Sequence, residues 1–264
     1  MKVKSVKLKD YKGELQLEDT NVYFLNSIRR VMLSELPKLA INSVIIYDNT
    51  TPLFDEIISH RLGMIPLPTD LRLLGFKEDC KCNGKGCPSC TVRYTLSKEE
   101  EGTVYSGDLQ PEHKSWAIKE EKIPIVELSK DQRIILEVEA NLGKGKDHAK
   151  FQAVQAPSYR MDISIEFDNK KIEEVKEFIK KLSPNLVELK GKKLELKDVK
   201  KLPVLESYID KEKVDFITIK RDPTKLTFHF ETDGSLSAKD ALKESVNIIM
   251  KKYEELDKQI KKLK

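Results

Sequence analysis

Residues 24–37 read Phe-Leu-Asn-Ser-Ile-Arg-Arg-Val-Met-Leu-Ser-Glu-Leu-Pro. Apolar side chains recur here at steps of three and four, as on one face of an α-helix; they are Leu25, Ile28, Met32 and Leu36. Pro37 ends the helix because proline has no backbone N–H to donate. Phe24, Val31 and Leu33 add apolar surface on further sides, which is more than a helix on one sheet requires. We therefore expect this helix to be buried on two sides, one of them by a partner or a second layer.

The C-terminal segment carries a second regular helix pattern. Ser237 and Asp240 have the spacing of a capping box. Apolar residues then follow at alternating steps of four and three, at Leu242, Val246, Ile249, Tyr253, Leu256, Ile260 and Leu263. Strict alternation is typical of a helix that lies along another long helix, whereas packing within one domain drifts toward a period of 3.6 residues. The periodicity alone leaves both packing within the chain and packing on a partner open.

The sequence between the two helices predicts mainly strands. Residues 40–47 form an apolar run typical of a strand, and residues 52–62 suggest a short helix with Gly63 as its C-cap. Short apolar runs separated by turns then predict strands at residues 92–96, 103–105, 116–118 and 134–140. A further strand is predicted at residues 161–167, where apolar and polar side chains alternate.

All four cysteines, Cys80, Cys82, Cys87 and Cys90, lie within eleven positions. Glycines and a proline stand between them, where the chain must turn sharply. Four thiolates this close in sequence suit a tetrahedral structural zinc ion, and a closed four-cysteine site leaves no open position for catalysis. Two alternatives remain open from the residues: disulfides or an empty loop, and an iron–sulfur cluster, which also takes four thiolates.

Composition excludes several classes of function. Charged residues make up 35% of the 264 residues, but the net charge is only +4, which gives no support to direct DNA binding by bulk charge. No apolar run approaches the roughly 18 residues of a membrane span, and no signal-peptide pattern opens the chain, so we expect a cytoplasmic protein without membrane contact. Phosphate loops and the His-Glu-x-x-His zinc motif are absent, and we expect no catalytic residue on this chain.

Four blocks of sequence resemble one known family. Residues 24–37 resemble the signature helix of the α-like assembly subunits of DNA-dependent RNA polymerases. Asp-Glu-Ile-Ile-Ser-His-Arg-Leu-Gly-Met-Ile-Pro-Leu at 55–67 resembles the next segment of the archaeal and eukaryotic members, which include the archaeal D subunits and the eukaryotic third-largest subunit. Gly-Lys-Asp-His-Ala-Lys-Phe at 145–151 is similar to their Gly-x-x-His-Ala-Lys-aromatic loop, and residues 230–235 are similar to their closing strand. The blocks occur in family order.

The resemblance implies an α+β fold with three parts. A split dimerisation domain would comprise residues 1–40, 158–168 and 222–264, with residues 41–157 inserted as a mostly β domain that carries the four-cysteine loop. Some archaeal members carry a ferredoxin-like module with an iron–sulfur cluster at the position of residues 169–221. This stretch contains no cysteine, so an iron–sulfur cluster is excluded there. Eukaryotic relatives carry a zinc-bearing loop in the inserted domain, which favours zinc at the four cysteines.

The resemblance also implies a function, that of a non-catalytic assembly platform in a nucleotidyltransferase complex. The family dimerises through its first long helix and its C-terminal helix with a small α-like chain, called subunit L in archaea. The second-largest subunit, the small zinc-bearing subunits and the largest subunit would then assemble on this heterodimer, and DNA would be contacted only through the complex. The implied interface residues are Phe24, Leu25, Ile28, Arg29, Arg30, Met32, Leu242, Val246, Ile249, Tyr253, Leu256 and Ile260.

Two other classes of function make different predictions. A stand-alone zinc-ribbon protein that binds nucleic acid would concentrate basic and aromatic residues around the cysteines. Only Lys81, Lys85, Arg93 and Tyr94 lie nearby, and two acidic residues oppose them. A metal-dependent enzyme would need an open coordination position and a nearby general base, and the cysteine loop contains no histidine or glutamate.

Overall fold

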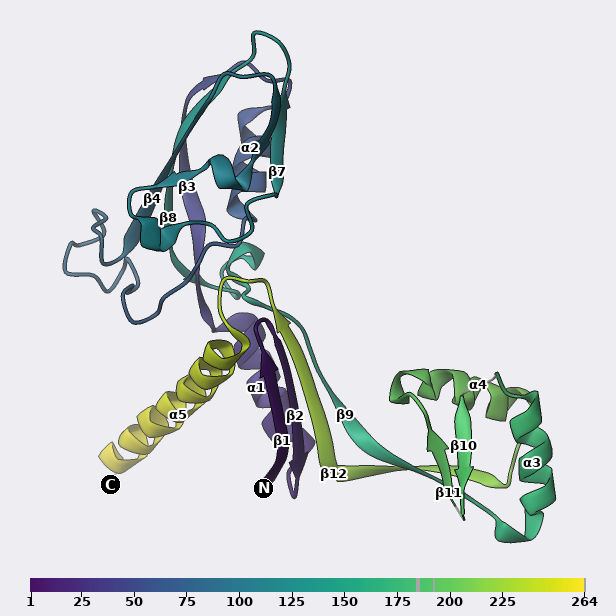
Figure 1. Cartoon of the computed structure of the whole chain (residues 1–264). Coiled ribbons are helices and arrows are strands. Elements are labelled where there is room, and N and C mark those ends of the chain that lie inside the picture. The colour runs from purple at the N-terminus through teal and green to yellow at the C-terminus, as the bar shows by residue number, and fades with distance from the viewer. Residues whose placement is uncertain (184–185, 192, 264) are drawn as a thin grey trace. The chain divides into compact units, whose positions relative to one another are not determined.

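The computed structural model describes residues 1–183, 186–191 and 193–263 (Figure 1). Over these residues the chain is a mixed helix-and-sheet protein with five α-helices and three sheets. It divides into two compact units. The smaller unit comprises residues 1–4, 16–22 and 159–227, and the larger unit comprises residues 5–15, 23–158 and 228–264. Residues 184, 185 and 192 of the predicted module at 169–221 lie outside the described residues.

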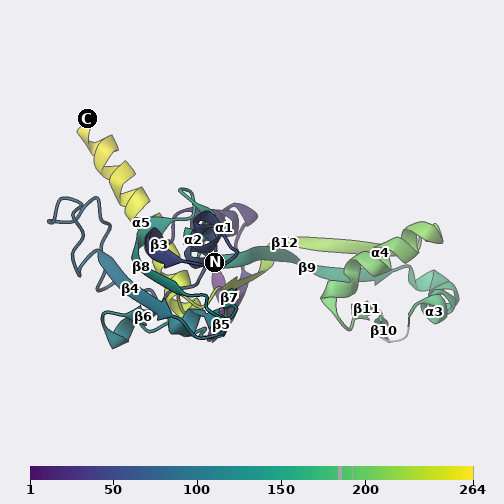
Figure 2. The same cartoon turned by 90° about the horizontal axis from the view of Figure 1, so that it is seen from above.

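The larger unit contains a four-stranded antiparallel sheet in the order β3-β8-β4-β6 and a separate β5–β7 pair (Figures 1 and 2). The strands are β3 (Pro37–Asn49), β4 (Thr91–Lys98), β5 (Gly102–Tyr105), β6 (Gln110–Pro111), β7 (Pro124–Leu128) and β8 (Ile134–Lys144). In β8 every second side chain is buried, from Ile134 to Ala140, as expected for a strand with one face on a core. Helix α2 (Asp55–Gly63) belongs to the same core through Ile58 and Leu62, which are fully buried.

Two local expectations for this region were wrong, and one strand was missed. Residues 116–118 form no strand, because Lys114–Trp116 make a 3₁₀ turn that buries the Trp116 ring. Strand β7 was not predicted. Gly63 is the last residue of α2 and not its C-cap: Met64 follows with ordinary right-handed backbone angles. The Met64 N–H donates to the Arg61 carbonyl and the Ile65 N–H donates to the Leu62 carbonyl, each over 3.2 Å. No left-handed turn is needed there, since the chain continues directly to the buried Ile65.

The predicted first helix is α1 (Val22–Ser34), and its buried residues are Leu25, Ile28, Val31 and Met32. The remaining strands form a six-stranded sheet, ordered β1-β2-β12-β9-β11-β10. The long strands of this sheet are β1 (Lys2–Lys9), β2 (Lys12–Glu18), β9 (Val154–Phe167) and β12 (Ile217–Thr232). Gly13 of β2 lies against Phe230 of β12: a Cβ on Gly13 would stand 2.2 Å from the Phe230 ring, so only glycine fits.

The smaller unit has a core of its own. Helices α3 (Ile172–Lys181) and α4 (Leu202–Lys211) accompany the hairpin of β10 (Val187–Lys190) and β11 (Lys193–Leu196), between the ends of β9 and β12. Val175 and Leu205 are fully buried in this core, and the rings of Phe178 and Phe216 meet edge to face with centroids 6.4 Å apart. Apolar packing therefore accounts for the folding of this cysteine-free segment.

The loop after β8 closes onto the end of α1. The N–H of Lys146 donates to the Ser34 carbonyl over 2.9 Å. A Cβ on Gly145 would stand 2.1 Å from the Leu33 carbonyl oxygen, so the glycine permits this close approach. Two of the sequence blocks, 24–37 and 145–151, thus meet in space. Among the described residues no helix is long and apolar enough to cross a bilayer.

Candidate metal centre and candidate subunit interface

The four cysteines lie in a tightly turned loop that ends at β4. Asn83, Gly84 and Gly86 all have left-handed backbone angles, with φ of 52°, 76° and 89°. The N–H groups of Cys90 and Thr91 both donate to the Cys87 carbonyl over 2.9 Å. These turns fold residues 80–90 back on themselves, so the four cysteine side chains face one point.

The sulfur positions fit a single tetrahedral ion. The Sγ–Sγ distances are 3.5 Å for Cys80 and Cys87, 3.6 Å for Cys82 and Cys90, and 3.8 Å for Cys87 and Cys90. All four sulfurs lie within 4.8 Å of one another. Zinc–sulfur bonds of about 2.3 Å in a tetrahedron place the sulfurs about 3.8 Å apart. All four cysteines are free, and an iron–sulfur cluster would spread the thiolates around several irons.

The thiols influence one another's protonation. The backbone N–H of Cys82 lowers the pKa of Cys80, but the neighbouring thiols of Cys87 and Cys82 outweigh it and raise that pKa to about 12. Burial raises the pKa of Cys82, whereas hydrogen bonds from Cys80 and from the backbone N–H of Gly86 lower it to about 6. Within this pair Cys82 is therefore the better proton donor, and a cation among the sulfurs would favour the thiolate form of its ligands.

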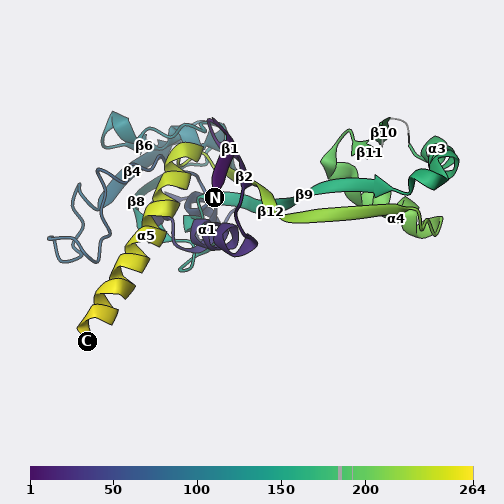
Figure 3. The same cartoon turned by 90° about the horizontal axis from the view of Figure 1, so that it is seen from below.

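The second candidate site is the exposed apolar stripe of α5 (Ala238–Lys262). Ser237 caps this helix as predicted: its Oγ accepts from the Asp240 N–H over 3.1 Å. Only Ala238, Ala241 and Ser245 are buried, and every described residue from 250 to 263 is exposed. The exposed apolar side chains of the stripe are Val246, Met250, Tyr253, Leu256, Ile260 and Leu263. The C-terminal half of α5 leaves the rest of its unit (Figures 1 and 3).

The predicted interface residues fall into two groups. On α5, Tyr253, Leu256 and Ile260 are 67%, 51% and 49% exposed, Val246 is exposed, and Leu242 and Ile249 are half-buried. On α1, Leu25, Ile28 and Met32 are buried within the chain itself. Phe24 and Arg30 are exposed, and Arg29 is half-buried and donates to Asn26 Oδ1 over 3.1 Å. The buried α1 residues can therefore contribute to such an interface only indirectly, by holding the exposed residues of α1 in place.

Two features of this surface were missed from the sequence. Met250, 55% exposed, broadens the stripe, and its position four residues after Val246 was the available signal. Tyr23, at the start of α1, is 82% exposed. Lys252 of α5 and Glu35 also form an ion pair that ties the middle of α5 to the residue just after α1.

The base of α5 is held by a buried ion pair. Lys38 Nζ lies 2.5 Å from Asp233 Oδ2, and the two side chains are only 4% and 10% exposed. The other Asp233 oxygen accepts from the Ser235 N–H and hydroxyl over 3.0 and 2.6 Å. The Ser235 carbonyl in turn accepts from the Thr69 N–H over 2.9 Å. These bonds fix the turn from which α5 starts.

The comparisons with known proteins all match subunits of RNA polymerases. A family model described as the RNA polymerase Rpb3/RpoA insert domain matches residues 40–168. DNA-directed RNA polymerase subunit Rpo3 of Picrophilus torridus is 33% identical over 264 residues, covering 95% of this chain and 96% of the relative. Subunit Rpo3 of Thermoplasma volcanium is 35% identical, covering 96% and 97%. Subunit Rpo3 of Methanosarcina mazei is 36% identical, covering 97% of both chains.

Proposed function

The chain belongs to the Rpo3 family of DNA-directed RNA polymerase subunits, the archaeal D subunits, and from this premise we propose that it is a non-catalytic platform on which the polymerase assembles. In this proposal α5 and the exposed start of α1 bind a small α-like subunit, subunit L. The second-largest subunit, the small zinc-bearing subunits and the largest subunit then assemble on the heterodimer, and DNA is reached only through the complex.

The observation that carries the proposal is the uncovered half of α5. An amphipathic helix normally derives most of its stability from packing of its apolar face. Here that face holds Met250, Tyr253, Leu256 and Ile260, all about half exposed or more. The strict alternation of steps of four and three favours another helix as the cover.

The architecture is proposed in the same terms. We assign residues 1–40, 158–168 and 222–264 to a dimerisation domain and residues 41–157 to an inserted domain. We assign the segment 169–221 to a ferredoxin-like module, which it forms together with the adjoining ends of β9 and β12. The elements follow the order β9-α3-β10-β11-α4-β12, and the β12-β9-β11-β10 strand order supports the assignment.

Expression of the full chain with and without the small α-like subunit tests the platform function. We expect the two chains to form a 1:1 complex, and we expect that complex to retain the second-largest subunit on an affinity column. A chain that remains monomeric in the presence of the α-like subunit, at concentrations above about 10 µM, would contradict the proposal.

For the four-cysteine loop we propose a structural zinc ion held by Cys80, Cys82, Cys87 and Cys90, which would tie the loop to the start of β4. The support is the tetrahedral spacing of the sulfurs. Replacing Cys87 and Cys90 by serine should remove about one zinc ion per chain and destabilise the inserted domain. Ser89→Ala, within the same loop, is the matched control and should keep the metal. Equal zinc contents in all three proteins would reject the site.

A further inference from the structure

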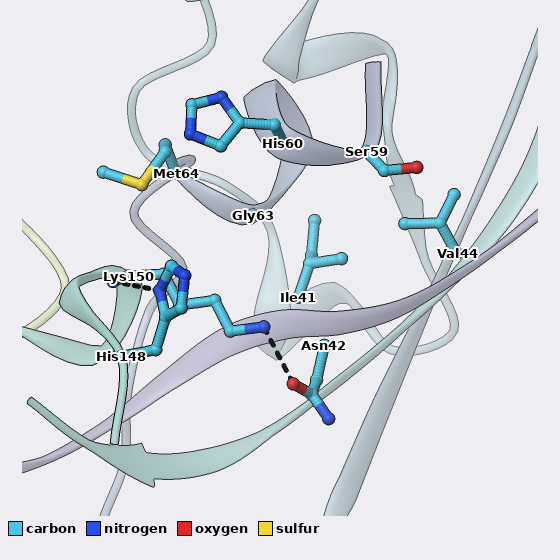
Figure 4. A pocket seen from close by; sticks show the side chains of 9 residues that line it. All are labelled: Ile41, Asn42, Val44, Ser59, His60, Gly63, Met64, His148 and Lys150. Carbon is cyan, nitrogen blue, oxygen red and sulfur yellow. Dashed lines mark hydrogen bonds between the residues drawn. The ribbon is translucent and has the colours of Figure 1, made fainter. Parts of the chain in front are cut away.

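A hollow of about 300 Å³ lies between α2, β3 and the loop that follows β8 (Figure 4). Its volume is at the lower end for ligand pockets and corresponds to one side chain or one small group. The polar side chains that line it are Asn42, Ser59, His60, His148 and Lys150. No aspartate or glutamate contributes to the lining, which makes the pocket rich in hydrogen-bond donors.

Lys150 brings a positive charge into this pocket without a counter-charge. Its Nζ donates to Asn42 Oδ1 over 2.8 Å and stands 5.1 Å from the Phe151 ring centroid. None of the ion pairs found among the described residues includes Lys150. The side chain is half-buried, and burial lowers the pKa of its ammonium group. An ammonium has three N–H donors, so two remain for a ligand.

The neighbours of Lys150 are oriented by hydrogen bonds. Because Asn42 Oδ1 accepts from Lys150, the amide NH₂ of Asn42 is left to donate. His148 Nδ1 accepts from the backbone N–H of Lys150 over 3.1 Å, so the neutral ring carries its proton on Nε2. Figure 4 shows His60 of α2 and Met64, the residue after α2, across the pocket from Asn42.

Gly63 keeps the pocket open. Its backbone is helical and does not require glycine, and a Cβ there would make ordinary contacts with Lys150 Cδ at 3.8 Å and the Ile41 carbonyl at 3.7 Å. A side chain at this position would therefore extend toward Lys150. The missing side chain leaves the space that a ligand would occupy.

We propose that this pocket binds the carboxylate of an acidic side chain from another polypeptide. Ile57 stands one turn before His60 on α2 and is 48% exposed, and Met64, which follows α2 and lines the pocket, is 49% exposed. An exposed apolar side chain beside a single cation suits a protein segment better than a phosphate backbone, which binds through several cations. That a second polypeptide supplies the carboxylate rests on the assembly function proposed above.

The four histidines allow a direct test with the full chain. The ring C–H signals of His60 and His148 report from the pocket, and those of His113 and His229 are controls in the same NMR spectrum. The probe is N-acetyl-aspartate, titrated at constant pH and ionic strength, with inorganic phosphate titrated separately. We expect the His60 and His148 signals to shift and saturate in the millimolar range, which is typical of one isolated charged group, while the other two signals stay in place.

Variants separate the pocket from its surroundings. Lys150→Gln should weaken binding of the probe at least tenfold, whereas Lys146→Gln, on the exposed part of the same loop, should leave it unchanged. Asn42→Asp places a carboxylate beside Lys150 at an exposed position and should abolish binding in a folded chain. This variant keeps the test decisive if Lys150→Gln folds poorly.

Two outcomes would overturn the proposal. Saturable binding of phosphate without binding of N-acetyl-aspartate would contradict the carboxylate assignment. Equal shifts of all four histidines, or no saturable shift, would show that the pocket binds no anion. Neither outcome depends on whether α5 binds the α-like subunit, so this inference and the platform function can fail separately.

Discussion

Removing two side chains from the exposed stripe of α5 should weaken subunit binding and leave the isolated chain intact. Leu256 and Ile260 are 51% and 49% exposed. Complete burial of such a side chain contributes about 1.5–3 kcal/mol, and about half of that surface is still available to a partner. The double substitution Leu256→Ala and Ile260→Ala should therefore cost about 1.5–3 kcal/mol of binding free energy, or roughly a 10- to 150-fold rise in Kd.

The matched control uses the opposite face of the same helix. Glu255 and Lys258 are exposed, and replacing both by alanine conserves the net charge. Binding of the α-like subunit, measured by isothermal titration calorimetry, should change less than twofold in this control. Thermal unfolding of either variant alone should match the parent chain within about 0.5 kcal/mol. Equal loss of binding in both variants, or none in the apolar variant, would refute the assignment of the stripe as an interface.

Three further predictions concern the larger unit. Lys38→Met should lower the free energy of unfolding by about 3–5 kcal/mol in a denaturant titration, because Asp233 would be left charged and buried; a loss below about 1 kcal/mol would show that the pair is not needed. Gly145→Ala should lower the melting temperature, because the new Cβ would collide with a backbone carbonyl oxygen. Gly75→Ala is the control and should leave the melting temperature unchanged, because a Cβ there meets no close atom. Equal melting temperatures of the two variants would contradict this reasoning. Asp108→Asn should destabilise the chain at pH 7. This loss of stability should fade as the pH falls through the folded-state pKa of Asp108, because ion pairing holds that pKa below its usual value. A loss of stability that is independent of pH would exclude the ion pair as its cause.

The physical cause of the Asp108 shift sets the sign of that prediction. Burial raises the pKa of Asp108, but Lys98 Nζ at 2.8 Å and the Tyr105 N–H at 2.7 Å lower it by more. A carboxyl with a depressed folded-state pKa contributes stability above its unfolded pKa of about 3.9 and loses it in acid. Stability curves of the parent and the variant should therefore converge below about pH 4.

The sequence predicted best where one residue pattern had one physical cause. The periodic helices α1 and α5 were expected where they occur, and Ser237 caps α5 as its spacing indicated. Four cysteines separated by turn-forming residues were expected to converge on one point, and their sulfurs do. Short apolar runs were harder to assign, because a run such as residues 116–118 can bury one aromatic ring in a turn without pairing as a strand.

Features that depend on distant contacts could not be predicted. Periodicity marked Leu25 and Leu256 alike as apolar helix positions, yet the first is buried within the chain and the second is half exposed. The Lys38–Asp233 pair joins residues nearly two hundred positions apart, and neither residue carries a local signal of burial. The pocket around Lys150 likewise required β3, α2 and the loop after β8 to be placed together.

Hydrogen exchange along α5 tests the central claim most directly. Amide exchange of residues 246–262 is measured in the full chain alone and in the presence of the small α-like subunit. Because every residue from 250 to 262 is exposed, this part of α5 should exchange rapidly in the isolated chain and become protected in the complex. Strong protection in the isolated chain, or unchanged rapid exchange in a complex known to have formed, would contradict the role of α5 as the docking helix of an assembly platform.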